Sequence, residues 1–321
     1  MKGIQINQTG GPEELIYTDI PLPEPGSDEV RIKIDAAGVN FVDIYFRKGQ
    51  YPKTPPFVPG MEAAGIVDSV GSAVSDFGPG DRVAYAMQLG SYAEYAVVPA
   101  WKLAKLPEDV DTKFGAALML QGMTAHYLAA STFALKPGDT ALVHAAAGGV
   151  GRLLVQIAKI KGARVFAVVS TEEKALLARQ AGADEVFIIG TVDFVAECKR
   201  LVPDGIDVVY DSVGVDTFEK SLDCLKPRGL MALYGQASGP VPPQDLQILN
   251  NIGSLFLTRP SLMHYAQNRE EISARTADLF QWIKTGKLEL KIDQELPLAD
   301  AVDAHRYLEA RKTKGKVLLI P

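Results

Sequence analysis

The sequence predicts a two-domain α/β protein in which a doubly wound parallel sheet is inserted into a β-rich domain. Three observations support this fold class. A turn of small residues at 145–151 joins a short apolar run to a segment with helical apolar spacing. Strand and helix patterns then alternate up to about residue 258. Before residue 124, short β-rich runs are instead separated by clusters of Pro and Gly.

The N-terminal segment, residues 1–123, has the composition of a β-rich, barrel-like domain. Its alternating or β-branched runs lie at 3–6, 30–37, 65–70, 82–86 and 91–98. Turn clusters rich in Pro and Gly separate these runs, as at 77–81. A single helix is expected over 40–48.

The middle of the chain alternates strands and helices. Strands are expected at 140–145, 164–169, 186–189, 207–210, 230–234 and 254–258, with helices at 149–161, 172–181, 194–201 and 216–225. This alternation predicts a six-stranded parallel sheet with helices on both faces. Later helices at 274–285 and 298–311 and a strand at 317–320 return to the first pattern.

We therefore expect a discontinuous catalytic domain, residues 1–123 with 259–321, around a dinucleotide-binding domain, residues 124–258. The cofactor is expected between the domains, beyond the carboxyl ends of the parallel strands.

The small-residue turn fits most of the dinucleotide-binding pattern G-x-G-x-x-G, with Ala146, Gly148 and Gly151 at the glycine positions. Gly148 would let the backbone approach a pyrophosphate, and Gly151 would let the helix approach the strand. Because Ala146 replaces the first glycine, that position must avoid positive φ or the turn must be looser. A tight turn in any α/β domain is the alternative reading of this motif.

The end of the second parallel strand bears on the choice of nicotinamide cofactor. NAD-binding versions of the fold place a carboxylate there, whereas this strand ends at Ser170. Lys174 follows and favours a 2′-phosphate, which indicates NADPH. The alternative is that Ser170 and Glu173 form a capping box and that Lys174 is a solvated helix residue. Glu172 and Glu173 would also disturb a phosphate.

Composition and charge narrow the classes of partner. The 321 residues carry a formal net charge of −6 without a basic stripe, which argues against nucleic acid. No run approaches the roughly 18 apolar residues of a membrane helix, so no membrane partner is expected. Cys198 and Cys224 form no C-x-x-C motif, and the N-terminus lacks a signal-peptide core. A cytoplasmic location follows as an expectation.

Motifs along the whole chain resemble those of the zinc-free quinone oxidoreductases, kin to zeta-crystallin in the medium-chain dehydrogenase/reductase superfamily. They are Gly-Pro-Glu at 11–13 and the runs at 37–43, 60–65, 80–83, 122–124, 144–151, 210–214 and 258–260. The resemblance implies a GroES-like catalytic domain, a Rossmann domain, NADPH as cofactor and a homodimer.

The resemblance also implies roles for two sets of residues. Those expected to line the nicotinamide and the active site are Asn40, Asp43, Tyr45 and Tyr51. Those expected to bind the cofactor are Asn40, Thr124, Tyr127, Gly148, Gly149, Val150, Ser170, Lys174, Ser212, Gly235, Ser238 and Arg259. One departure is Ile189, where relatives often carry a Tyr beside the 2′-phosphate and adenine. Its loss is expected to soften the preference for NADPH.

The positions that hold catalytic zinc in other superfamily members carry Asn40, Met61 and Glu62 here. An amide and a thioether are poor ligands for Zn²⁺. Two cysteines cannot supply a four-cysteine structural site, and the four histidines, at 126, 144, 264 and 305, show no ligand spacing. We therefore expect no metal.

A site without a Lewis acid disfavours alcohol oxidation and favours reduction of an electron-poor acceptor such as a quinone. Hydroxyls of Tyr45 and Tyr51 or the Asn40 amide would stabilise the anion that forms, unless they serve only in packing. The nearest alternative is an NADPH-dependent enal, enone or enoyl-thioester reductase on the same fold. A further alternative is a crystallin-like protein that binds NADPH or RNA with little turnover.

Overall fold

The computed structural model describes all 321 residues, and contacts within the chain divide it into two units. The first contains residues 1–123, 266–280 and 290–321, and the second contains residues 124–265 and 281–289. This division places residues 259–265 and 281–289 in the second unit, whereas the sequence pattern assigned them to the catalytic domain. The domain limits expected from the sequence remain a prediction. Each unit is described separately below.

The second unit is built on a six-stranded sheet in the order β10-β9-β8-β11-β12-β13. Every neighbouring pair is parallel, as the alternating pattern predicted. The strands are β8 (Thr140–His144), β9 (Arg164–Val169), β10 (Glu185–Ile188), β11 (Ile206–Asp211), β12 (Leu225–Leu233) and β13 (Phe256–Thr258). The strand order reverses between β8 and β11, which is where ligands bind in doubly wound sheets.

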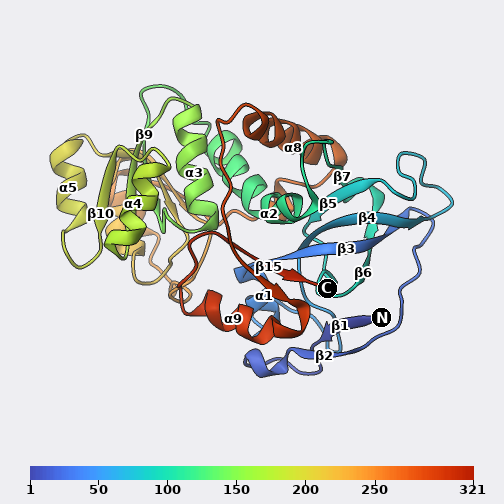
Figure 1. Cartoon of the computed structure of the whole chain (residues 1–321). Coiled ribbons are helices and arrows are strands. Elements are labelled where there is room, and N and C mark those ends of the chain that lie inside the picture. Colours follow the sequence, from blue (N-terminus) through green and yellow to red (C-terminus); the bar gives the residue numbers. More distant parts are fainter. The chain divides into compact units, whose positions relative to one another are not determined.

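Helices alternate with these strands: α3 (Gly149–Ile160), α4 (Glu172–Gln180), α5 (Phe194–Leu201), α6 (Phe218–Leu222) and α7 (Gln247–Gly253). Figure 1 shows α3 and α4 beside β9 and β10, and these helices contact β8, β9 and β10. All five residues of β8 are buried, as expected for a strand covered on both faces. The helix expected over 216–225 is shorter because Leu225 is already the first residue of β12, where it pairs with Ile206 of β11.

A side-chain clamp explains why residues 281–289 belong to the second unit. The Gln156 amide on α3 donates through Nε2 to the Glu289 carbonyl at 3.0 Å. Its Oε1 accepts from the Glu289 backbone N–H at 2.7 Å. The pair satisfies both backbone groups of Glu289 and ties the segment after α8 (Arg269–Lys284) to α3.

The first unit contains a seven-stranded sheet with the path β14-β15-β3-β4-β5-β7, and β6 pairs with β3. Its strands are β3 (Glu29–Val39), β4 (Glu62–Val70), β5 (Arg82–Ala86), β6 (Tyr95–Pro99), β7 (Ala104–Lys105), β14 (Ile292–Pro297) and β15 (Lys316–Ile320). A hairpin of β1 (Lys2–Gln5) and β2 (Ile16–Asp19) forms a separate sheet. Because β15 pairs antiparallel with β3, the C-terminal segment belongs to this unit.

Two helices and three short turns lie wholly within the first unit. The helices are α1 (Phe41–Arg47) and α9 (Ala301–Glu309), and the 3₁₀ turns are Pro12–Glu14, Ala100–Lys102 and Leu298–Asp300. A fourth 3₁₀ turn, Leu262–His264, lies in the second unit. The strand expected over 91–98 begins only at Tyr95. The reason is that the backbone N–H groups of Ser91 and Tyr92 donate to Gly60 and Pro59, outside the sheet.

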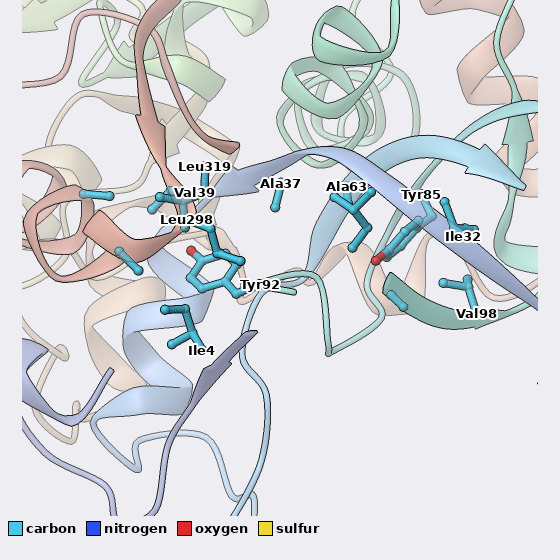
Figure 2. Close-up of a cluster of buried hydrophobic side chains, with 14 of the residues drawn as sticks. Ile4, Ile32, Ala37, Val39, Ala63, Tyr85, Tyr92, Val98, Leu298 and Leu319 are labelled. Carbon is cyan, nitrogen blue, oxygen red and sulfur yellow. The ribbon is translucent and has the colours of Figure 1, made fainter. Parts of the chain in front are cut away.

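The core of the first unit contains two fully buried tyrosines, Tyr85 and Tyr92 (Figure 2). The labelled aliphatic neighbours in Figure 2 include Ile4, Val39 and Leu298, which belong to the same cluster. A buried phenol requires a hydrogen-bond partner. Tyr85 is paired with Ser91 Oγ at 3.0 Å, and Tyr92 donates to a carboxylate described below.

The sequence pattern missed α2 (Thr112–Tyr127), which continues as a π-helical turn over Leu128–Thr132. Its residues from 115 to 129 are almost all buried, so it shows no one-sided apolar stripe. Both α2 and α8 include residues of the two units. None of the helices is long and apolar enough to cross a bilayer.

Candidate cofactor and reductase site

The residues expected to bind the cofactor gather at one edge of the parallel sheet. Each follows the carboxyl end of a strand: Gly148, Gly149 and Val150 after β8, Ser170 after β9, Ser212 after β11, Gly235 and Ser238 after β12, and Arg259 after β13. Carboxyl ends of parallel strands share one edge, which is the ligand-binding edge of this fold. With Thr124, Tyr127 and Lys174 they all lie in the second unit, whereas Asn40 lies in the first.

The glycine turn differs in detail from the expectation. The left-handed residue is Ala145, with φ of 50°, while Ala146 is not in that region. The replacement of the first glycine at 146 therefore costs no strain. A Cβ on Gly151 would lie 2.3 Å from the Ala145 carbonyl oxygen, so only glycine fits there. At Gly148 the same distance would be 3.2 Å, which is tight.

The first turn of α3 fits a dinucleotide pyrophosphate. Gly148 is the N-cap and offers no side-chain cap. The backbone N–H groups of Gly149, Val150 and Gly151 have no acceptor within the chain. Free N–H groups at the positive end of a 12-residue helix bind anions well.

The end of β9 presents Ser170, which is exposed. The N-cap of α4 is Thr171, whose side chain accepts from the Lys174 N–H at 3.3 Å. The capping box of Ser170 and Glu173 considered above is therefore wrong, and the Ser170 hydroxyl remains available. Ile189 follows β10 next to this strand end, with 49% of its surface exposed. An apolar surface thus borders Ser170.

The turns after β11 and β12 approach each other closely. A Cβ on Gly235 would lie 2.5 Å from the Ser212 carbonyl oxygen, so the two backbones touch. The Ser238 N–H donates to the Val213 carbonyl at 2.7 Å. Arg259 donates to the Leu233 carbonyl at 3.1 Å, which holds its guanidinium at the same edge.

A buried polar cluster that sequence reasoning missed fixes the switch point of the sheet. The Asp211 carboxylate accepts from the Val213 N–H at 2.7 Å, from Thr217 Oγ1 at 2.6 Å and from Ser221 Oγ at 3.1 Å. Ser221 Oγ also lies 2.8 Å from His144 Nε2. Because the serine proton goes to Asp211, His144 donates from Nε2. Burial lowers the pKa of His144, which keeps this ring neutral.

Two predicted cofactor residues on α2 are buried. Tyr127 is 1% exposed, and its ring stacks on Tyr265 with centroids 4.4 Å apart. Thr124 is 8% exposed, one helical turn earlier. Direct contact of either residue with a cofactor remains a prediction.

The four predicted active-site residues of the first unit separate into two environments. Asn40 and Asp43 are buried, while Tyr45 and Tyr51 are half-buried, with ring centroids 5.4 Å apart. Tyr51 also lines an open groove of about 620 Å³ with Thr9, Gly49 and residues 52–55. The structure therefore brings the two phenols together near a surface depression that Asn40 and Asp43 do not line.

Asn40 is the N-cap of α1 and makes a reciprocal cap with Asp43, whose Oδ2 accepts the Asn40 N–H at 2.8 Å. Both hydrogens of the Asn40 amide are used, by Gly38 O at 3.1 Å and Glu62 Oε2 at 2.9 Å. Its Oδ1 accepts from Lys316 Nζ at 2.8 Å. In this arrangement the Asn40 amide has no N–H left for a substrate, so the donor role expected for it requires one of these bonds to break.

Comparison with known proteins identifies the family. The family described as "Alcohol dehydrogenase GroES-like domain" matches residues 26–108, and the family described as "Zinc-binding dehydrogenase" matches residues 149–284. A quinone oxidoreductase of Pseudomonas aeruginosa is 47% identical over 100% of this chain and 99% of its own length. The chain belongs to the quinone oxidoreductase family of the medium-chain dehydrogenases/reductases.

Two further relatives of this quinone oxidoreductase family member are informative. A 2-haloacrylate reductase of a Burkholderia species is 45% identical over 98% of both chains. The crystal structure of Escherichia coli quinone oxidoreductase complexed with NADPH has a TM-score of 0.98 and 43% identity over 100% of both chains. The GroES-like and Rossmann folds implied by the sequence are thereby confirmed.

The name of one matching family raises the question of zinc, and the residues of this chain do not fit that metal. The sequence resemblance places Asn40, Met61 and Glu62 at the positions expected to hold catalytic zinc in other superfamily members. The Lys316 ammonium is hydrogen-bonded to both Asn40 and Glu62 and would repel a divalent cation there. No group of three or more His, Cys, Asp or Glu side chains is arranged to hold a metal ion.

Proposed function

We propose that this protein reduces quinones with NADPH and without a metal ion. The observation that supports this most strongly is the sheet edge of the second unit. There the free N–H groups of α3 and the carboxylate-free end of β9 match the needs of a dinucleotide with a 2′-phosphate. Relatives named quinone oxidoreductase share 43–47% identity over nearly the whole chain.

Each predicted cofactor residue has a physical task in this proposal. The N–H groups of Gly149 and Val150 bind the pyrophosphate at the positive end of α3. Ser170 and Lys174 bind the 2′-phosphate, and the exposed Ile189 side chain offers an apolar surface to the adenine. Glu172 opposes the phosphate less than its charge alone implies, because its carboxylate is paired with Arg179 at 3.2 Å.

The chemistry of the acceptor follows from what the first unit offers. NADPH, when bound, supplies a hydride or electrons from nicotinamide C4. Tyr45 and Tyr51 offer phenolic groups to the oxygen that gains negative charge, and solvent provides protons. A quinone needs no further activation, since it is already electron-poor. The remaining task of the chain is to hold the acceptor against the nicotinamide.

Reduction of an activated alkene is the second candidate activity. The observation in its favour is the 45% identity to a protein named 2-haloacrylate reductase. An alkene conjugated to an electron-withdrawing group accepts a hydride as a quinone does, and the anion formed needs the same hydrogen-bond donors. Enals, enones and enoyl thioesters belong to this class.

We also infer a cytoplasmic homodimer without nucleic-acid or membrane partners. The strand β13 is an edge strand of the parallel sheet, and its residues Phe256 and Leu257 are 60% and 37% exposed. Leu246 nearby in the chain is 71% exposed. An exposed apolar strand edge favours pairing with an identical edge across a two-fold axis. Sedimentation of the protein and of Phe256→Glu tests this, since the variant should become monomeric.

A panel of acceptors tests the proposed activity. Initial rates of NADPH oxidation should be compared for p-benzoquinone, 2-haloacrylate, an enal and an enoyl thioester. Turnover of quinones supports the first candidate. Turnover of the alkenes alone would replace it with the second, and NADPH binding without turnover of any acceptor would support a crystallin-like binding protein.

A further inference from the structure

Two opposite charges lie one turn apart on the buried face of α1 but do not touch. Asp43 and Arg47 are both 0% exposed. The Arg47 guanidinium donates to the two Glu309 carboxylate oxygens, both at 3.0 Å, and lies 3.1 Å from His305 Nδ1. Asp43 receives hydrogen bonds only from the Asn40 N–H and Tyr92. Residues from α9 and from the loop before β6 therefore fill the space between the two charges.

The direction of each hydrogen bond in this chain is forced. A guanidinium only donates, so His305 Nδ1 must accept from Arg47 and carries no proton. Burial and the neighbouring Arg47 lower the pKa of His305 to about 3, so the ring is neutral at ordinary pH. Its one proton is on Nε2 and is donated to the Tyr92 oxygen at 3.2 Å. Tyr92 then donates its own proton to Asp43 Oδ2 at 3.0 Å.

We propose that Arg47, His305 and Tyr92 are positioning residues of the reductase, forming a one-way chain of hydrogen bonds that holds Asp43 and the first turn of α1 in place. Asp43 is fully buried, so it acts through the backbone it caps rather than by touching a substrate. This inference rests on the proposed function, because the groups it positions are those of the proposed site.

The positioned elements can be followed from Asp43 in both directions. Through the Asn40 N–H, Asp43 fixes the residue whose amide is bonded to Glu62 and Lys316. Two residues further along α1, the Tyr45 carbonyl accepts the N–H groups of Gln50 and Tyr51, at 2.9 and 3.2 Å. A shift of α1 would therefore move the Tyr45 and Tyr51 rings as well.

The charged groups that face Asp43 give the sign of a pH effect. Burial raises the pKa of Asp43 to about 7, and Glu62 on β4 adds to that rise. The Asn40 N–H, Lys316 on β15 and the Tyr92 hydroxyl act in the opposite direction. Arg47 on the same helix and Glu309 on α9 do not contact Asp43 directly and are linked to it only by the hydrogen bonds through His305 and Tyr92. Removing the Tyr92 hydroxyl should move the pKa of Asp43 upward.

The test compares Tyr92→Phe with Tyr85→Phe, a matched control. Both tyrosines are 0% exposed in the same core, but Tyr85 pairs with Ser91 and takes no part in the series of hydrogen bonds from Arg47 to Asp43. We expect Tyr92→Phe to lower kcat for p-benzoquinone about tenfold, leave the KM for NADPH unchanged, and move the acidic limb of log kcat against pH to higher pH. Tyr85→Phe should keep the wild-type profile. Equal profiles for Tyr92→Phe and the wild type, or equal losses in both variants, would overturn the inference.

Variants at His305 provide rescue and a readout independent of turnover. His305→Gln keeps a donor and an acceptor and should retain most activity, whereas His305→Leu should resemble Tyr92→Phe. Long-range proton–nitrogen NMR of the wild-type His305 ring should show a neutral imidazole protonated at Nε2. A ring protonated at Nδ1 would refute the proposed series of hydrogen bonds from Arg47 to Asp43, even if no acceptor is turned over. Failure of every acceptor together with the expected tautomer would instead refute only the proposed function.

Discussion

Lys316 Nζ donates to Asn40 Oδ1 at 2.8 Å and joins the last strand to the N-cap of α1 across 276 positions of sequence. The same ammonium pairs with Glu62, and both side chains are fully buried. The pair neutralises the Glu62 charge without a metal ion and also fixes the Asn40 amide. A protein-derived cation therefore lies beside Asn40 and Glu62, two of the residues that the resemblance places at zinc positions.

Replacement of Lys316 by Met should strongly destabilise the protein. The change leaves Glu62 as an uncompensated buried charge, for which the expected loss is about 3–5 kcal/mol in the free energy of unfolding. Urea unfolding measures it. Arg306→Met, which removes an exposed partner of Asp303, is the control and should change stability little. The double variant Lys316→Met with Glu62→Gln should recover part of the loss; no recovery would show that the pair is not the cause.

Replacement of Gly151 by Ala should weaken NADPH binding by at least roughly tenfold, or about 1.4 kcal/mol. The new Cβ would meet the Ala145 carbonyl oxygen at 2.3 Å, and the turn would have to move away from α3. Fluorescence titration measures the Kd. Gly78→Ala is the matched control, since a Cβ there meets nothing within 4 Å. An unchanged Kd in Gly151→Ala would contradict the assignment of the pyrophosphate site.

Ser170→Asp should reverse the preference between the two nicotinamide cofactors. A carboxylate at this strand end repels a 2′-phosphate and accepts from ribose hydroxyls. We expect NADPH to bind about 10–100-fold more weakly relative to NADH, in line with about 1.4 kcal/mol per tenfold. Titration of both cofactors measures the ratio. Ser72→Asp adds the same charge at an exposed turn of the first unit and should leave the ratio unchanged.

Ile189→Tyr should strengthen NADPH binding by a few-fold. The side chain is 49% exposed beside Ser170, so a tyrosine ring has room to stack on the adenine. A weaker Kd for NADPH in the variant would indicate that the cofactor does not pass this side chain.

His305 should make stability depend on pH on the acidic side. Its pKa falls from 6.5 to about 3 on folding, so the unfolded chain binds one more proton between these values. The His305 contribution is complete above pH 6.5 and is lost as pH falls toward 3, by about 1.4 kcal/mol per pH unit. His305→Gln lacks this loss. Unfolding free energies at several pH values should therefore show the variant gaining on the wild type below pH 6.5; a constant difference would contradict this.

Local patterns predicted the parts of the structure that depend on neighbours in sequence. The buried run of β8 and the stripe of α3 were visible as periods, and the end of β9 at Ser170 was read from its residues. By contrast, α2 is buried on nearly all sides and shows no stripe. The pairing of Arg47 with His305 joins positions 258 residues apart, and no local period records it. The sequence argued against a metal-ligand role for His305, but it indicated neither the burial of this residue nor its partners.

The most direct test of the account is the rate of p-benzoquinone reduction with NADPH, measured against NADH, before and after exhaustive dialysis with a chelator. We predict turnover that is unchanged by the chelator, with a higher kcat/KM for NADPH than for NADH. Activity that disappears on chelation and returns with zinc, or failure of any quinone to oxidise NADPH, would contradict it.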